Sequence, residues 1–200
     1  MTDGESTAGP FENPAPMVED TVDLDNPFWR FSLAVYAAKT VRETALDSQD
    51  RFGADVNLML LCCWVGFSGV MLDEKGLRRL DRLVDGWRRE VIDPIRTVRR
   101  QLSEAIGPMA PQVTRALRED VKGVELQAEQ IQQAVLYRAL ETLPGRDARL
   151  AERSGVARMN LTVYLRDVRG IDDTGVLKDI VEAMVLGCRG TVESDEDDVV

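Results

Sequence analysis

Residues 56–72 read VNLMLLCCWVGFSGVML and contain no charged side chain. An asparagine, a serine and two glycines interrupt this stretch, and the part before Gly66 has only about half of the roughly 20 apolar residues that a membrane-spanning helix needs. The pattern therefore predicts a buried central helix over Leu58–Val65, followed by a turn, and no membrane span. Asp55 stands just before this segment and is expected to cap the helix.

A mostly apolar helix is predicted upstream of this segment. Asn26, or the aspartate before it, can accept hydrogen bonds from the first turn, and Pro27 lacks an N–H that would be unpaired there in any case. Aromatic and aliphatic residues up to Tyr36 then occupy more than one face. A helix with so little polar surface is expected to be mostly buried.

Capping residues and glycines predict where the shorter helices begin and end. Thr40 with Glu43 forms a capping-box pattern, and the helix that it opens is expected to end at Gly53. The last helix of the chain is expected to begin at a pair of aspartates and to end at Gly187 and Gly190.

Two long apolar stripes predict two long helices. The first stripe consists of Leu77, Leu80, Val84, Trp87, Val91, Ile95, Val98 and Leu102. The second stripe consists of Val113, Leu117, Val121, Val124, Ala128, Ile131, Val135 and Ala139. Because a short segment with Gly107 separates them, we expect an antiparallel helical hairpin with Trp87 packed in the core. Pro94 should kink or split the first helix, with Asp93 as a new cap.

No stretch of the chain alternates with the period of a β-strand, so the predicted fold class is all-α. We expect a single helical domain of roughly six to eight helices over residues 25–191, including the long antiparallel hairpin. The flanking segments 1–24 and 192–200 are rich in acids and contain no lysine or arginine, so they account for all of the formal net charge of -10. Both tails are expected to be disordered, which leaves a body that is close to neutral.

Three cysteines and the start of the chain indicate a cytoplasmic protein. Cys62 and Cys63 are adjacent and Cys188 is far away in the sequence, a spacing that does not suggest a disulfide framework. We expect three reduced, buried and inert thiols. The first residues carry acids where a secretory signal needs lysine or arginine, so export is not expected.

The sequence predicts no catalytic residue, no cofactor-binding residue and no metal ligand set. It contains no histidine, the commonest general base and metal ligand. It also has neither of the common glycine-rich phosphate loops. Adjacent acids such as Asp172 and Asp173 are explained as helix caps, and others as solvated helix faces. A carboxylate-based enzyme stays open as an alternative, but the chain favours a non-enzymatic role.

A row of arginines gives a second alternative. Arg82, Arg89 and Arg96 recur every seven residues and, with Arg100, form a possible interaction surface on the first long helix. Solvated charges paired with nearby acids explain this row, and a nucleic-acid-associated protein is the other interpretation. The favoured hypothesis is a cytoplasmic helical protein that binds another protein, as an adaptor or regulator, with an unknown partner.

The chain resembles an uncharacterised proteobacterial family of small proteins, a domain of unknown function. The resemblance rests on the opening motif Asn26-Pro-Phe-Trp-Arg-Phe-Ser-Leu-Ala-Val-Tyr36, on residues 49–58 and on residues 87–99. Residues 121–129 and Asn160-Leu-Thr-Val-Tyr-Leu165 are similar to its second half. The resemblance covers about residues 25–187. It implies one helical domain, but it implies no activity, no cofactor and no site residue.

Overall fold

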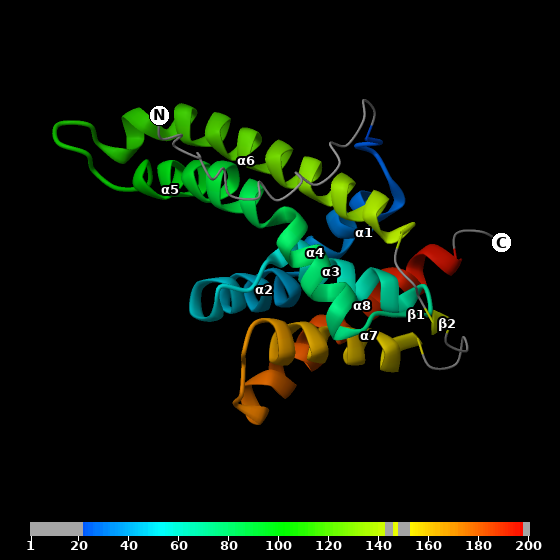
Figure 1. Cartoon of the computed structure of the whole chain (residues 1–200). Helices are drawn as coiled ribbons and strands as arrows, with labels where there is room; N and C mark the ends of the chain where they lie inside the picture. The colour runs from blue at the N-terminus through cyan, green and yellow to red at the C-terminus, as the bar shows by residue number, and fades with distance from the viewer. Residues whose placement is uncertain (1–21, 143–145, 148–152, 198–200) are drawn as a thin grey trace, which may run out of the picture.

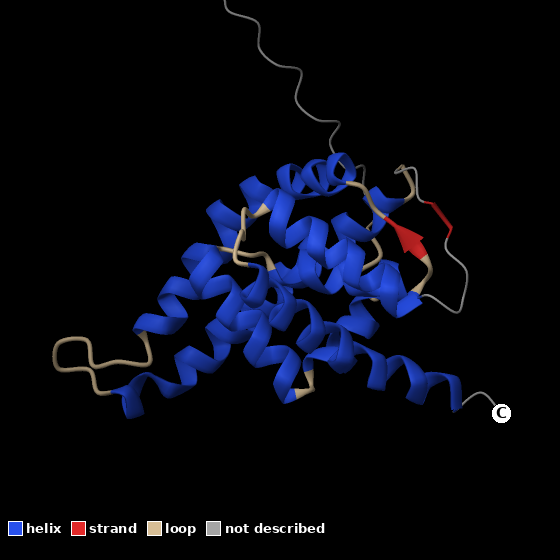
Figure 2. Ribbon diagram, turned by 90° about the horizontal axis from the view of Figure 1, so that it is seen from below, coloured by secondary structure: helices blue, strands red, loops and turns tan. Residues whose placement is uncertain are grey.

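The computed structural model describes residues 22–142, 146–147 and 153–197, which are almost entirely helical (Figures 1 and 2). The first helices are α1 (Pro27–Tyr36), α2 (Lys39–Phe52) and α3 (Val56–Phe67). The hairpin consists of α4 (Glu74–Trp87), the π-helix η1 (Arg88–Ile92), α5 (Asp93–Gln101) and α6 (Pro111–Leu140). The chain ends with α7 (Arg153–Thr162), the π-helix η3 (Val163–Val168) and α8 (Thr174–Asp197). The predicted all-α fold class is confirmed.

Helix α3 forms the centre of the molecule, as its uncharged sequence predicted. Asp55 caps it by accepting the backbone N–H groups of Asn57 and Leu58, so the predicted cap is confirmed. Nearly every side chain from Asn57 to Phe67 is buried. A continuous cluster of buried side chains joins α3 to helices from both ends of the chain. None of the helices in the described residues is long and apolar enough to cross a membrane.

Two glycines allow helices to approach each other closely. A Cβ atom built on Gly66 would lie 2.3 Å from the Cα of Ala157, so the close contact of α3 with α7 requires glycine. A Cβ built on Gly187 would lie 2.2 Å from Cγ2 of Val41, which joins α8 to α2 in the same way. Both positions were interpreted as helix ends from the sequence, and both lie inside helices.

The polar side chain of Asn160 fixes the end of α3 against α7. Its amide nitrogen donates to the carbonyl of Val70 at 3.0 Å, and its oxygen accepts the N–H of Leu72 at 2.9 Å. The chain between these contacts includes β1 (Val70–Met71), which pairs antiparallel with β2 (Arg146–Asp147). This two-residue pair is the extent of the sheet among the described residues.

The hairpin projects beyond the rest of the molecule (Figure 1). Two side-chain hydrogen bonds set the register of its arms: the indole N–H of Trp87 donates to the carbonyl of Ala128 at 3.0 Å, and the hydroxyl of Thr114 donates to the carbonyl of Leu102 at 3.0 Å. The first arm is not broken at Pro94. Instead η1 replaces one α-helical turn directly before the proline.

The wide turn of η1 explains how the arm continues. The N–H of Asp93 bonds to the carbonyl of Arg88, five residues back. Proline cannot donate the next helical hydrogen bond, and a π-turn before it accommodates the missing bond without a break. Asp93 itself is in helical conformation, so the prediction that it caps a new helix was wrong.

Other local predictions gave mixed results. The cap at Asn26 and the end of α2 at Gly53, in left-handed conformation with φ of 63°, are confirmed. The capping box was wrong, because α2 begins at Lys39, one residue before Thr40. Helix α8 extends from Thr174 to Asp197. Residues 1–21 and 198–200 lie outside the described residues.

The three cysteines are free and buried. Burial raises the pKa of the Cys62 thiol well above its ordinary value. A hydrogen bond with Cys188, followed by burial, raises the pKa of Cys63. Neither thiol is ionised near neutral pH, as the expectation of inert thiols requires.

Candidate functional site: a buried charge network between two clefts

The centre of the site is Asp55, whose side chain combines a structural and an electrostatic role. The residue is only 5% exposed, and one carboxylate oxygen caps α3. The other oxygen accepts from Arg88 at 2.8 Å and from the amide nitrogen of Gln132 at 2.7 Å. The backbone N–H of Asp55 donates to the hydroxyl of Tyr164 at 2.8 Å. Segments from four parts of the chain therefore meet at this residue.

Arg88 holds three carboxylates together. Besides Asp55, it contacts Asp81 at 3.0 Å and Asp85 at 2.7 Å, and its side chain is 13% exposed. Burial lowers the pKa of the Arg88 guanidinium, but attraction to Asp55 and hydrogen bonds to Asp85 and Asp55 outweigh it, so the pKa is raised. The hydrogen bond from Arg88 lowers the pKa of Asp85.

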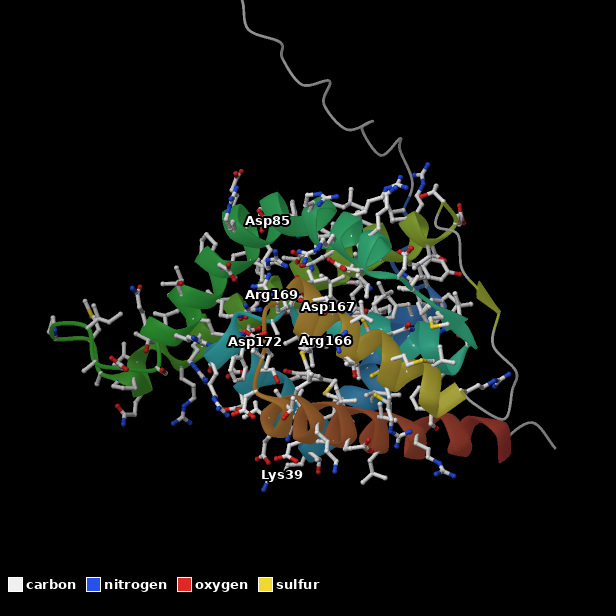
Figure 3. All side chains as sticks on the ribbon, turned by 60° about the horizontal axis from the view of Figure 1, so that its bottom comes forward. Lys39, Asp85, Arg166, Asp167, Arg169 and Asp172 are labelled. Carbon is white, nitrogen blue, oxygen red and sulfur yellow. The ribbon has the colours of Figure 1, made fainter. Side chains whose placement is uncertain are left out.

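Arg169 completes this first cluster from the end of η3. Its Nη1 lies 3.6 Å from Asp81. Arg169 and Asp85, both labelled in Figure 3, line the same cleft although they belong to segments far apart in the sequence. Arg89 also contacts Asp85, at 3.3 Å, so three arginines face three carboxylates and the charges of this cluster balance.

A second cluster is centred on Arg96 of α5. Arg96 contacts Glu125 at 2.9 Å, Glu129 at 3.0 Å and Asp93 at 3.2 Å. Arg99 also binds Glu125, with its Nη2 at 3.2 Å from the carboxylate. Burial raises the pKa of Glu129, and the attraction to Arg96 opposes this shift only in part.

Two clefts lie on either side of the second cluster. The polar cleft, of about 520 Å³, is lined mostly by charged residues that include Asp50, Asp55, Arg88, Arg96, Arg100 and Glu129. The amphipathic cleft, of about 480 Å³, has a mostly apolar wall that includes Trp29, Leu33, Tyr36, Leu46 and Leu126. Arg96 and Glu129 line both clefts.

The predicted arginine row is divided in the structure. Arg89, Arg96 and Arg100 line the polar cleft, whereas Arg82 lies in a separate shallow depression beside Lys75 and Arg78. Arg96 is 15% exposed and bound to three carboxylates, and Arg100 contacts Asp50 at 2.7 Å. Arg96 would have to leave these partners before it could bind a phosphate, which works against the nucleic-acid interpretation.

The paired carboxylates do not form a catalytic arrangement. Asp55, Glu125 and Glu129 are each bound by arginine, which occupies lone pairs of the carboxylate. A general acid needs an available proton near the operating pH, and burial raises the pKa of Glu129 in that direction. Among the described residues, no group of three or more histidine, cysteine or acidic side chains could hold a metal ion.

Sequence reasoning missed the two glutamines of α6 and the role of Arg88. Gln132 and Gln133 are 1% and 2% exposed, and Gln133 donates to the side-chain oxygen of Asn57 at 2.8 Å. The sequence did contain one signal, the asparagine two positions after Asp55 in an otherwise apolar segment. Two polar side chains that are buried there need hydrogen-bond partners from another element. Nothing in the sequence identified α6 as that element.

The apolar stripe of α6 was also placed incorrectly. Val113, Leu117 and Val124 are 73%, 54% and 50% exposed, so much of the stripe faces away from the core. Trp87 is 36% exposed, and its predicted core position was wrong. The buried face of α6 contains glutamines and Glu125 because it binds the polar groups of α3 and α5.

Comparisons with known proteins identify the chain at the level of its family. No curated protein and no solved structure matches it. Residues 27–136 match the family described as "Protein of unknown function (DUF2390)". The match covers α1 to α5 and most of α6, including both arginine clusters apart from Arg169, and ends before the similarity noted at residues 160–165. The chain therefore belongs to the DUF2390 family of proteins of unknown function.

Proposed function

We propose that this protein is a non-enzymatic adaptor or regulator that binds another protein through one side of its hairpin. The observation that carries the proposal is a line of exposed apolar side chains, here called the seam. It consists of Trp87, Val98, Val113, Leu117, Val124 and Ile131. Large exposed apolar patches on a protein surface mark interaction sites.

Helical geometry places the α6 residues of the seam on one line. Val113, Leu117, Val124 and Ile131 are separated by four, seven and seven positions. At 3.6 residues per turn these positions fall within about 40° of one another, along about 27 Å of helix. The hydrogen bond from Trp87 to Ala128 brings the first arm alongside this line.

The charged side of the hairpin lies elsewhere. Glu125 and Glu129 point from α6 toward Arg96 and Arg99, and Leu126 lines the amphipathic cleft. These positions are rotated on α6 by more than about 80° from the centre of the seam. On α6 the seam carries one exposed acid, Asp120, within about 20° of Val113, and it lies on the hairpin that projects from the rest of the molecule (Figure 2).

A partner that fits this surface is an amphipathic helix with apolar residues spaced three and four apart. Such a helix lies along two antiparallel helices in the way that a further helix joins a bundle. A cytoplasmic setting is part of the proposal, because Cys62, Cys63 and Cys188 are buried free thiols that a reducing compartment preserves.

Photo-crosslinking in the native cell tests the proposal. A photoreactive phenylalanine analogue at Leu117 should crosslink to one partner, and mass spectrometry should place the crosslink in an amphipathic helix. The same analogue at Leu186, which is 70% exposed on α8, serves as the matched control and should not capture that partner.

Substitutions distinguish specific binding at the seam from non-specific hydrophobic association. Leu117→Asp with Val124→Asp should abolish the interaction without unfolding the protein, because both side chains are about half exposed. Leu186→Asp should leave it intact. Equal capture from both positions would contradict the proposal. A crosslink to a second copy of this chain would show that the seam is a homodimer interface and not a binding site for a different protein.

A further inference from the structure

We propose that the amphipathic cleft binds a small amphipathic cation, with its apolar body against the leucine wall and its ammonium group at Glu129. This inference is independent of the proposed function, because the cleft and the seam lie on different sides of α6.

The wall of the cleft gathers exposed leucines from three helices. Leu33 of α1 is 48% exposed, Leu46 of α2 is 38% exposed and Leu126 of α6 is 45% exposed. Trp29 and Tyr36 of α1 line the same hollow. A cleft of about 480 Å³ is within the size range of small-molecule sites, which are mostly apolar with a few polar groups.

The charge cluster beside the cleft favours a cation. Arg96 and Arg99 face three carboxylates, so the cluster carries one excess negative charge; Glu125 and Glu129 line this cleft, whereas Asp93 lines the polar cleft. Glu125 is bound by both arginines, whereas the ion pair of Glu129 is with Arg96 alone, at 3.0 Å, and Arg96 is shared with the other two acids.

Glu129 is consequently the acid that gains most from a further positive partner. Burial raises its pKa, as expected for a carboxylate that the protein's own cations do not fully compensate. Lys122 and Glu119, which also line the cleft, lie 3.7 Å apart and compensate each other. They therefore leave the excess charge of the cluster unchanged.

Polar groups beside the cleft point to the same conclusion independently. Ser32 and Gln133 line the cleft, are 3% and 2% exposed, and each has a side-chain oxygen without a hydrogen-bond partner among the described residues. The unpartnered amide oxygen of Gln133 can only accept. This part of the molecule therefore has more hydrogen-bond acceptors than the chain itself uses, which suits an ammonium donor.

Gly123 leaves open space in the cleft. A Cβ atom built on this residue meets no atom within 4 Å, although the residue lies within α6. A larger side chain here would enter the space that the apolar body of the ligand is proposed to fill. It would not disturb the packing of the helix.

Calorimetric titration of the full-length protein at pH 7 with hexylamine, hexanol and hexanoate tests the proposal. The three probes share an apolar chain and differ in the charge of the head group. We expect hexylamine to bind about tenfold more tightly than hexanol, the difference that one charge-assisted hydrogen bond produces, and hexanoate to bind least. Equal binding of amine and alcohol, or tightest binding of hexanoate, would overturn the assignment of the head group.

Two variants then locate the site. Glu129→Gln should remove the advantage of hexylamine over hexanol while the protein stays folded. Gly123→Leu should abolish binding of hexylamine, and Gly86→Leu, at an equally open glycine on α4 outside the cleft, should not. Unchanged binding by Gly123→Leu, or loss of binding by both leucine variants, would place the ligand elsewhere and refute the proposal.

Discussion

Arg88 has three carboxylate partners. The loss in the free energy of unfolding when Arg88 is removed depends on the most buried of these carboxylates. Arg88→Leu would leave Asp55, at 5% exposure, with the amide of Gln132 and two backbone N–H groups but without its cation. Breaking a buried ion pair from one side costs about 3–5 kcal/mol. We expect a loss of this size in the free energy of unfolding, measured with urea.

Arg89 is the matched control for this substitution. It is the next residue in η1, but its side chain is 65% exposed, and its contact with Asp85 is 3.3 Å. Arg89→Leu should change the free energy of unfolding by less than about 1 kcal/mol. Similar losses for the two variants would show that the buried network does not stabilise the fold.

Glu129 gives a prediction for pH dependence. Burial raises its pKa in the folded protein above the ordinary value of 4.5, so the folded state binds a proton more tightly than the unfolded state does. Its favourable contribution is complete below pH 4.5 and is lost as the pH rises through the folded pKa. Glu129→Gln should therefore gain stability relative to the wild type as the pH rises from 4 to 7.

Urea unfolding of both proteins across this range measures the effect. The variant keeps an oxygen that can accept from Arg96, so the difference isolates the charge. A variant that loses stability relative to the wild type with rising pH would show that the ion pair with Arg96 outweighs the cost of burial.

At the scale of the helices, two contacts require glycine. Gly66→Ala would force a methyl group against the backbone of Ala157 in the adjacent helix α7, at 2.3 Å before relaxation. Overpacking of this kind costs about 1–3 kcal/mol in the free energy of unfolding. Gly86→Ala, at an open position in α4, should instead stabilise the protein by up to about 1 kcal/mol. Thermal or urea unfolding of the two alanine variants gives the comparison, and equal effects would contradict the packing argument.

The sequence predicted those helix ends that are fixed by hydrogen bonds and backbone conformation close by in the chain. The caps at Asn26 and Asp55 and the left-handed end at Gly53 follow from hydrogen bonds and backbone freedom within a few residues. Gly187 was misinterpreted because the reason for a glycine there is Val41, which is distant in the sequence. No local pattern distinguishes a glycine that ends a helix from one that admits another helix.

The candidate site was less predictable than the fold, because its contacts also join residues that are far apart in the sequence. Asp55 was identified only as a cap, and its contact with Arg88 spans 33 positions of sequence. The apolar stripe of α6 was correct as a helical pattern, but periodicity does not show whether a face meets the core or a partner. The buried glutamines became interpretable only when α6 lay against Asp55 and Asn57.

At the scale of the whole molecule, the projecting hairpin should differ in stability from the body. Its distal part is held by contacts between the two arms, such as that of Thr114 with Leu102, whereas α3 lies inside the continuous core (Figure 1). Segments with few buried apolar contacts open locally without global unfolding. Backbone amides of residues 113–118 should therefore exchange hydrogen through a smaller opening free energy than those of residues 58–65.

Native-state hydrogen exchange at increasing denaturant concentration measures both opening free energies. The amides of α3 should exchange only by global unfolding, with a steep dependence on denaturant. Equal values and slopes in the two segments would show that the hairpin unfolds together with the body.

Arg96 and Glu129 line both clefts, and this shared wall has a thermodynamic consequence. An anion in the polar cleft that attracts Arg96 would weaken its hold on Glu129 and so increase the affinity of the other cleft for a cation. The coupling is reciprocal, because the cation must raise the affinity for the anion by the same factor. Two solutes of opposite charge would then bind this protein cooperatively through the ion pair of Arg96 and Glu129.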